Sequence, residues 1–137
     1  MDLYDGNFEL KGIQKLEGHT DRVWSLAWKP ATGVAGVPPV FASCSGDKTV
    51  RIWEQDPSTW SWNCKEVLEE TYTRTVRSCA WSPSGKLLAT ASFDATTAIW
   101  ENVGGDYECI STLEENRLLA SASDDGPIKI WELAKLH

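Results

Sequence analysis

His19 and the acids of the chain are the residues best suited to catalysis, because a histidine beside an aspartate could form half of a charge-relay arrangement. The sequence has only two histidines, and no serine or cysteine in a nucleophile elbow accompanies His19. Paired acids and phosphate-binding loops with the required context are also missing. We therefore predict that the protein is not an enzyme, that it has no catalytic residue, and that His19 is structural.

The four cysteines could in principle bind a metal or an iron–sulfur cluster. Cys44, Cys64, Cys79 and Cys109 are spaced 20, 15 and 30 residues apart, without a C-x-x-C pair. Zinc and iron–sulfur sites need closely spaced ligands, and this spacing supplies none. We expect no metal and no cofactor, and we interpret the cysteines as small buried apolar residues in a reducing compartment.

The composition and charge of the chain indicate which kinds of partner to expect. The net charge is −7 and the isoelectric point is near 4.8, whereas nucleic-acid binding depends on Lys and Arg, so we expect no nucleic acid as partner. The opening residues, MDLYDGNFELKG, lack the basic and apolar regions of a signal peptide, and no apolar run is long enough to span a membrane. We expect no membrane partner and a cytoplasmic location, with the nucleus as an alternative.

Internal repeats organise the chain. Three segments align: FASCSGDKTVRIW (41–53), LATASFDATTAIW (88–100) and LASASDDGPIKIW (119–131). Each has an aspartate six residues before its final tryptophan. Upstream, VWSLAWKP (23–30) matches VRSCAWSP (76–83), but the third repeat has no such partner. We predict two complete repeats and a partial third.

Apolar residues alternate with a period of two within each repeat, which is typical of strands. Further strands are expected at 60–68 and 106–113, where Cys64 and Cys109 each precede a leucine by four residues. The sequence therefore predicts an all-β chain. We divide it into an N-terminal segment at 1–15, repeats at 16–68 and 69–113, and a partial last repeat at 114–137.

The third repeat is short. Trp53 and Trp100 are 47 residues apart, but Trp100 and Trp131 are only 31 apart, a difference of 16 residues. That difference is about the length of one strand with its two turns. Pro127, where the other repeats have threonine, also removes a strand N–H. We place the irregularity at the junction of residues 114 and 115.

The segment LEGHTDRVWSLAWKP…FASCSGDKTVRIW resembles a WD40 repeat, the four-stranded blade of a β-propeller, with Gly18-His19, Asp47 and Trp53 in register. This resemblance implies a buried hydrogen-bond network in which the histidine reaches the turn aspartate, a serine at position 43 or 45, and the tryptophan. Tyr72 replaces the histidine in the second repeat. The predicted network residues are His19, Asp47, Trp53, Tyr72, Asp94, Trp100, Asp125 and Trp131.

Two segments, RTVRSCAWSPSGKLLATASFDATTAIWENVGGDYECISTLE and NRLLASASDDGPIKIWEL, are similar to the WD40 adaptor family of cytosolic iron–sulfur cluster assembly. The resemblance implies a non-catalytic adaptor whose partners are the proteins of the targeting complex and the apo-proteins that receive clusters. Two alternatives stay open. One is a generic WD40 module of the ubiquitin-ligase or chromatin-adaptor kind, and the other is a shortened splice or gene-model product with little function of its own.

Partner contacts should lie where the repeats differ. Trp24 is matched by Arg77, and Gly46 by Phe93, at positions that in WD40 propellers lie near the channel mouth. Aromatic and arginine side chains supply most interface hot spots, so Arg22, Trp24, Arg77 and Phe93 are our candidate contact residues. The alternative is that Trp24 and Phe93 pack on a neighbouring blade.

Two blades and a remnant cannot close a ring, since propellers usually contain about four to eight blades. We therefore predict an open fan, in which unpaired blade faces open a route to self-association. The segment FELKGIQKL (8–16) is available as an outer strand beside residues 126–133.

Overall fold

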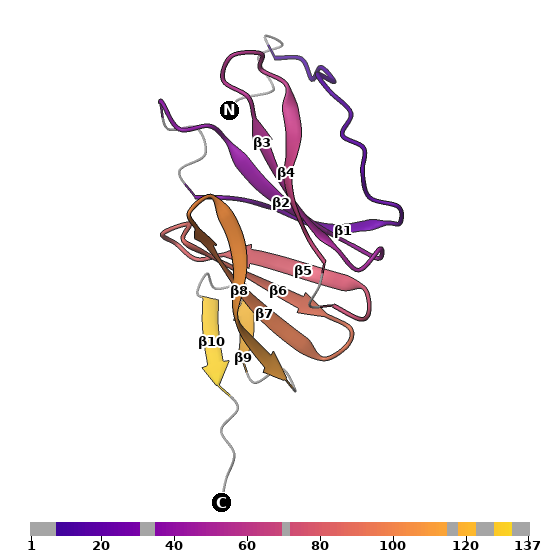
Figure 1. Ribbon diagram of the computed structural model, residues 1–137, viewed down its shortest axis with the longest axis vertical. Coiled ribbons are helices and arrows are strands. Elements are labelled where there is room, and N and C mark those ends of the chain that lie inside the picture. The colour runs from indigo at the N-terminus through magenta and orange to yellow at the C-terminus, as the bar shows by residue number, and fades with distance from the viewer. Residues whose placement is uncertain (1–7, 31–34, 70–71, 115–117, 123–127, 133–137) are drawn as a thin grey trace, which may run out of the picture.

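The computed structural model describes residues 8–30, 35–69, 72–114, 118–122 and 128–132, which form three antiparallel sheets (Figure 1). Blade 1 has the order β1-β2-β3-β4, blade 2 the order β5-β6-β7-β8, and β9 pairs with β10 alone. The bounds are β1 Val23–Trp28, β2 Val40–Ser45, β3 Val50–Gln55, β4 Trp62–Leu68, β5 Val76–Trp81, β6 Leu87–Ser92, β7 Thr96–Val103, β8 Asp106–Glu114, β9 Leu118–Ala122 and β10 Ile128–Glu132.

The predicted fold class is confirmed. The described residues contain two complete four-stranded blades, a two-stranded remnant, no helix and no closed ring of blades. Among them there is accordingly no helix that could cross a membrane. Figure 1 shows the two blades one above the other, with β9 and β10 beyond the second.

The core lies between the two blades. Val50 and Ile52 are fully buried on the side of blade 1 that faces blade 2, and Val76 and Leu88 are fully buried on the opposing side of blade 2. Each buried aliphatic side chain contributes about 1.5–3 kcal/mol relative to exposure. The apolar layer between the two sheets is therefore the main hydrophobic stabilisation of the fold.

Polar contacts cross the same interface. The Trp81 indole N–H donates to the Ala27 carbonyl at 2.9 Å, and the Tyr107 backbone N–H donates to the Glu66 carboxylate at 2.9 Å. The Lys29 ammonium lies 5.8 Å from the centroid of the Trp81 ring. These directional contacts fix the orientation in which blade 2 packs on blade 1.

The cysteines follow the sequence interpretation only in part. Cys44 and Cys79 are buried in the interface between the blades, as expected for small apolar residues. Cys64 is partly exposed, and Cys109 is exposed, so the prediction of burial is wrong for Cys109. Both lie on the outermost strands of their blades, opposite Trp53 and Trp100 at a register shift, where less of the fold covers them.

The N-terminal segment is also placed differently from the expectation. Residues 8–16 form no strand, and Gln14 instead contacts β4 of blade 1. Its side-chain amide donates to the Trp62 carbonyl at 3.0 Å and accepts from the Trp62 N–H at 2.9 Å. The predicted pairing of 8–16 beside 126–133 is therefore wrong, since β10 pairs only with β9 among the described strands.

Candidate functional site

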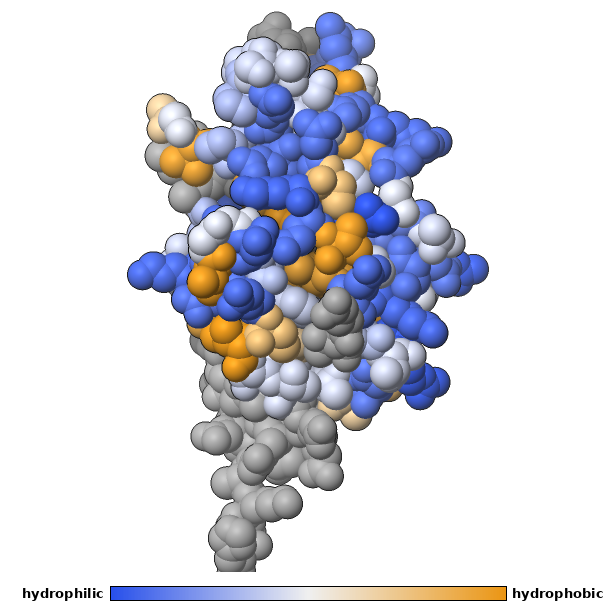
Figure 2. Space-filling model, viewed as in Figure 1, coloured by the Kyte–Doolittle hydropathy of each residue, from blue (hydrophilic) through white to orange (hydrophobic). Residues whose placement is uncertain are grey.

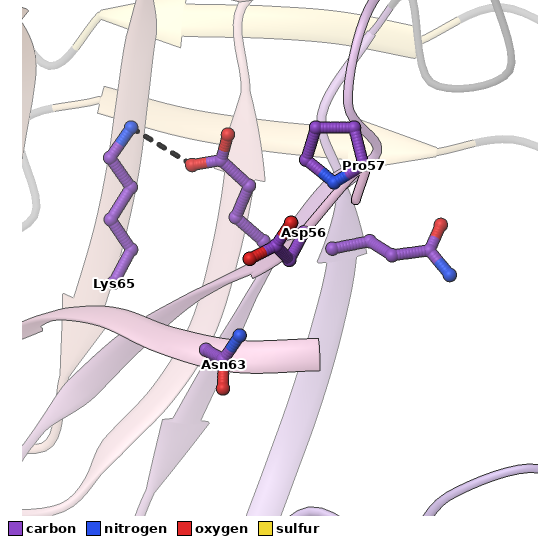
Figure 3. Close-up of a pocket in the computed structure, with 6 residues that line it drawn as sticks. Asp56, Pro57, Asn63 and Lys65 are labelled. Carbon is purple, nitrogen blue, oxygen red and sulfur yellow. Dashed lines mark ion pairs between the residues drawn. The ribbon is translucent and has the colours of Figure 1, made fainter. Parts of the chain in front are cut away.

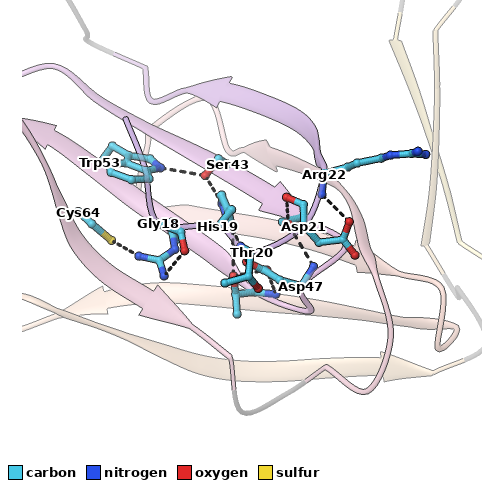
Figure 4. A network of polar contacts seen from close by, with 12 residues as sticks. Gly18, His19, Thr20, Asp21, Arg22, Ser43, Asp47, Trp53 and Cys64 are labelled. Carbon is cyan, nitrogen blue, oxygen red and sulfur yellow. Dashed lines mark hydrogen bonds and ion pairs between the residues drawn. The ribbon is translucent and has the colours of Figure 1, made fainter. Parts of the chain in front are cut away.

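His19 lies in a nearly buried polar network at the end of blade 1 (Figure 4). Its Nδ1 lies 2.8 Å from Asp47 Oδ2, and its Nε2 lies 2.7 Å from Ser43 Oγ. The Trp53 indole N–H donates to the same Ser43 hydroxyl at 2.8 Å. Ser43 thus joins the histidine to the tryptophan, and through them it links β2, β3 and the segment before β1.

The turn after β2 positions Asp47. The Thr49 backbone N–H donates to Asp47 Oδ1 at 3.0 Å, and the Thr20 N–H donates to Oδ2 at 3.0 Å. Burial tends to raise the pKa of Asp47, but hydrogen bonds from Thr49, His19 and Thr20 outweigh it and lower the pKa to about 2. Asp47 is therefore a carboxylate at neutral pH, held as an acceptor and not as a proton donor.

Blade 2 builds the corresponding network around a phenol. Tyr72 OH contacts Thr90 Oγ1, and the Trp100 indole N–H donates to Tyr72 OH at 2.7 Å. Asp94 takes no part in that cluster, and accepts instead from the Thr73 N–H at 3.0 Å. Burial raises the pKa of the Tyr72 phenol, which stays neutral and can donate.

Arg51 belongs to the blade 1 network, although its spacing in the sequence did not indicate it. Its Nη2 donates to the Gly18 carbonyl at 3.1 Å, and its Nη1 donates to Cys64 Sγ at 3.4 Å. A Cβ at position 18 would lie 2.8 Å from Arg51 Nη1, so only glycine leaves room for this contact. Gly18 therefore admits the guanidinium between the N-terminal segment and β4.

Trp24 and Arg77 are the bulge residues of their strands. The register of β1 with β2 shifts between Val23 and Ser25, and that of β5 with β6 shifts between Val76 and Ser78. A bulge re-aims the extra residue, and bulges are common beside functional sites. The Arg77 guanidinium carbon lies 4.8 Å from the centroid of the Trp24 ring, and both side chains remain exposed.

Arg22 lies just before β1, and Phe93 lies just after β6, next to the start of β5. The Phe93 N–H donates to the Thr75 carbonyl at 2.9 Å, just before β5, and the equivalent bond in blade 1 runs from Gly46 to Arg22 at 2.9 Å. Phe93 is 57% exposed, and the Arg22 side chain points away from the network (Figure 4). The structure thus places Arg22 and Trp24 at the start of β1, Arg77 at the start of β5 and Phe93 in the turn after β6. It brings Trp24 and Arg77 into direct contact.

Two predicted network residues belong to the third repeat. Asp125 lies outside the described residues. Trp131 lies in β10, where its backbone pairs with Leu119 of β9.

The described residues include no group of three or more His, Cys, Asp or Glu side chains that could hold a metal ion. A shallow pocket of about 320 Å³ lies beside the β3–β4 turn (Figure 3). Lys65 and Glu54 form an ion pair at 2.9 Å across it. The pocket is lined by Glu54, Gln55, Asp56, Pro57, Asn63 and Lys65.

The repeated blade geometry and its His–Ser–Trp network define a WD40 repeat protein. The chain belongs to this family, because the model of the WD domain, G-beta repeat, matches residues 10–54 and 62–101. The predicted resemblance to WD40 repeats is confirmed. A solved structure, that of Sqt1 from Saccharomyces cerevisiae, supports the fold alone, with a TM-score of 0.65 at 19% identity over 85% of this chain and 33% of that one.

Among curated proteins, "Protein CIA1" of Arabidopsis thaliana is 71% identical over 115 residues, covering 83% of this chain and 33% of that protein. "Probable cytosolic iron-sulfur protein assembly protein Ciao1" of Culex quinquefasciatus is 50% identical, over 74% of this chain and 28% of that protein. "Protein transport protein SEC13" of Chaetomium thermophilum is 40% identical, over 74% and 32%. The chain spans about a third or less of the length of these relatives.

Proposed function

We propose that this chain is a non-catalytic WD40 scaffold of cytosolic iron–sulfur protein assembly, which mediates the transfer of clusters to apo-proteins through protein–protein contacts. The observation that carries the proposal is its similarity to relatives named as cytosolic iron–sulfur protein assembly proteins, at 50% and 45% identity. The SEC13 relatives, at 37% and 40%, favour a generic WD40 interaction module as the second candidate. The higher identity supports the first candidate over the second.

The proposed contact surface is formed by the starts of β1 and β5 and by the turn after β6, and it consists of Arg22, Trp24, Arg77 and Phe93. Trp24 is 41% exposed, and Arg77 covers one face of its ring. An indole held by a cation–π contact keeps a fixed orientation, so a partner that buries it loses little side-chain entropy. The physiological setting of this surface is the cytoplasm, and its partners are proteins of the targeting complex and apo-protein clients.

The experiment that tests the function measures binding of the purified chain to purified proteins of the cytosolic iron–sulfur targeting complex and to an apo-protein client. Binding in the micromolar range or tighter to at least one of them is expected. Binding to none of them, together with binding to a protein partner of the protein-transport relatives, would favour the generic module instead.

Variants then locate the contact surface. Trp24→Ala and Arg77→Ala should each weaken binding by about tenfold or more, because truncation of a central hot spot costs about 2 kcal/mol. Trp60→Ala is the matched aromatic control, since Trp60 is 72% exposed on the β3–β4 turn. Lys86→Ala, in the turn at the other end of β5, is the matched basic control. Equal losses in the controls would contradict this placement of the surface.

A further inference from the structure

Two cysteine thiols meet at the interface between the blades. Cys44 lies on β2 of blade 1 and is fully buried, and Cys79 lies on β5 of blade 2 and is 8% exposed. The two side chains form a hydrogen bond with each other. Because the residues belong to different repeats, only the packing of blade 2 on blade 1 brings the thiols together.

The backbone around the pair holds both sulfur atoms in the interface. Cys44 Sγ lies 3.7 Å from the Ser25 carbonyl oxygen on β1, and Cys79 Sγ lies 4.0 Å from the Ala42 carbonyl oxygen on β2. Ala42 and Cys44 share one face of β2, since strand side chains alternate with a period of two. Cys79 thus reaches across the interface to the strand that carries Cys44.

The two strands approach unusually closely at this point. Cα atoms of β2 and β5 lie within 8 Å of each other, whereas packed sheets are usually about 10 Å apart. The small side chains of Ala42 and Cys44, both fully buried, leave room for this approach. A disulfide requires two backbones at short range, and the interface between the blades provides that condition.

The other two cysteines have different surroundings. Cys64 Sγ accepts from the Arg51 guanidinium at 3.4 Å, and Cys109 Sγ lies 3.5 Å from Thr112 Oγ1. Both contacts stay within one blade, on its two outermost strands. Cys44 and Cys79 are therefore the cysteines that the fold arranges as a pair.

We propose that Cys44 and Cys79 form a redox-sensitive pair, which a peroxide converts into a disulfide between blade 1 and blade 2 and which a dithiol reductant restores. The Cys44 thiolate attacks one oxygen of hydrogen peroxide, the O–O bond breaks, and a sulfenic acid forms while hydroxide leaves and takes up the thiol proton as water. The Cys79 sulfur then attacks the Cys44 sulfur and displaces the hydroxyl group, which leaves with the Cys79 proton as a second water. Two electrons pass from the two thiols to the peroxide.

The order of the two thiols follows from their hydrogen bond. That hydrogen bond lowers the pKa of the Cys44 thiol against the effect of burial, and together with burial it raises the pKa of the Cys79 thiol. The thiolate is the nucleophilic form of cysteine. Cys44 is therefore the thiol that reacts with the oxidant, and Cys79 is the thiol that completes the disulfide.

The surroundings of the pair favour a small, uncharged oxidant. Figure 2 shows separate clusters of apolar side chains across the middle of an otherwise polar surface, seen from one side. Both thiols lie in the buried apolar cluster between the blades. Hydrogen peroxide is small enough to enter when the interface opens locally, whereas a charged aromatic reagent is not. Peroxide should thus oxidise this pair in the folded protein.

A disulfide here would join the two strands that carry Trp24 and Arg77. Ser25, whose carbonyl contacts Cys44, directly follows Trp24, and Cys79 follows Arg77 by two positions. The bond would also close a long loop that contains β3 and β4. Closing a long loop restricts the unfolded chain, so the oxidised protein should unfold at a higher urea concentration than the reduced protein.

Peroxide treatment of the full chain carrying Cys64→Ser and Cys109→Ser tests the proposal, because only the pair remains. The folded protein is treated with hydrogen peroxide, then unfolded in urea and alkylated without reductant. We expect a monomer that has lost the mass of two hydrogen atoms, takes up no alkyl group and regains both thiols with dithiothreitol. Its urea midpoint should be higher than that of the reduced chain. Peptide mapping of the peroxide-treated wild type should find the same link between positions 44 and 79.

Addition of Cys79→Ser to this variant is the matched control. It keeps Cys44 but has no second thiol, so peroxide should neither remove two hydrogen atoms nor raise the urea midpoint. Circular dichroism establishes that both variants are folded. The proposal is overturned if both thiols are still alkylated after peroxide, if the disulfide forms only between copies of the chain, or if the oxidised chain is no more stable than the reduced one.

Discussion

Tyr72 occupies in blade 2 the place that His19 occupies in blade 1. Each side chain contacts the hydroxyl of the equivalent residue on the second strand, Thr90 or Ser43. The Trp100 indole N–H donates to the Tyr72 phenol at 2.7 Å and to the Thr90 hydroxyl at 3.2 Å, whereas the Trp53 indole N–H donates to the Ser43 hydroxyl. One blade architecture thus accepts two different polar networks, provided that the tryptophan N–H finds an acceptor.

Replacement of the central residue of each network should therefore destabilise the protein by different amounts. His19→Ala removes the hydrogen bonds of the imidazole with Asp47 and Ser43 and leaves both residues short of a partner, so the free energy of unfolding should fall by about 2–3 kcal/mol. Tyr72→Phe removes only the hydroxyl, and should cost about 1–2 kcal/mol. Urea denaturation measures both. A loss below about 0.5 kcal/mol for His19→Ala would contradict this account of the network.

Stability should depend on pH through Asp47. Its pKa is about 2 in the folded protein and about 3.9 in an unfolded chain, so the stabilisation is complete above about pH 4 and is lost as the pH falls toward 2. The difference between these two pKa values corresponds to roughly 2 kcal/mol of folding stability. Solvent screens this contribution little, because the Asp47 side chain is only 7% exposed.

Asp47→Asn isolates that contribution. The variant should be less stable at pH 7, and its free energy of unfolding should change less between pH 4 and pH 2 than that of the wild type. Burial tends to raise the pKa of Asp94, but hydrogen bonds from Thr73 and Thr96 outweigh it and lower the pKa to about 2. Asp94 therefore keeps part of the pH dependence in this variant. Asp106→Asn, at an exposed position, serves as the control. Identical acid profiles for Asp47→Asn and the wild type would exclude this role.

The interface between the blades should be sensitive to single polar contacts. Trp81→Phe retains an aromatic ring but loses the N–H that reaches the Ala27 carbonyl, so we expect a loss of about 1 kcal/mol. Trp60→Phe should have no measurable effect, because Trp60 is 72% exposed. Thermal unfolding followed by circular dichroism measures both variants. Equal shifts in Tm would argue against a cross-blade hydrogen bond.

The four thiols should react with an aromatic disulfide reagent in an order set by the fold. Cys109 is exposed and should react first, with Cys64 next, whereas Cys44 and Cys79 should react only after unfolding. A hydrogen bond with Cys44, together with burial, raises the pKa of the Cys79 thiol, which further suppresses its thiolate. Cys109→Ser should remove the fast phase alone. Rapid labelling of Cys79 in the native protein would show that the blades separate readily.

Much of this structure follows from the spacing of a few residues in the sequence. The interval from Asp47 to Trp53, repeated from Asp94 to Trp100, predicted the turn and the strand after it, because a strand alternates faces with a period of two. Sequence alternation does not reveal which neighbour covers a face. Val50 and Ile52 are buried, while their counterparts Thr97 and Ile99 are only partly buried, although both pairs follow the same pattern.

Other features had no sequence signal of their own. The contact between Arg77 and Trp24 depends on bulges in two strands and on the angle between blades, neither of which a residue pattern encodes. Exposure of Cys109 depends on its position on the outermost strand. The comparison of repeats could identify positions 24 and 77 as variable, but it could not show that these two residues touch.

The Gln14 side chain caps the outer edge of blade 1, at β4. Its primary amide uses one N–H as a donor and its oxygen as an acceptor, and in this way it pairs with both backbone groups of Trp62 on β4. Unpaired backbone at a sheet edge is a template onto which extended chains can add. A single glutamine side chain therefore blocks the addition of another strand at Trp62. The Trp62 amide should exchange its hydrogen slowly, and Gln14→Ala should leave this sheet edge open to fibril growth.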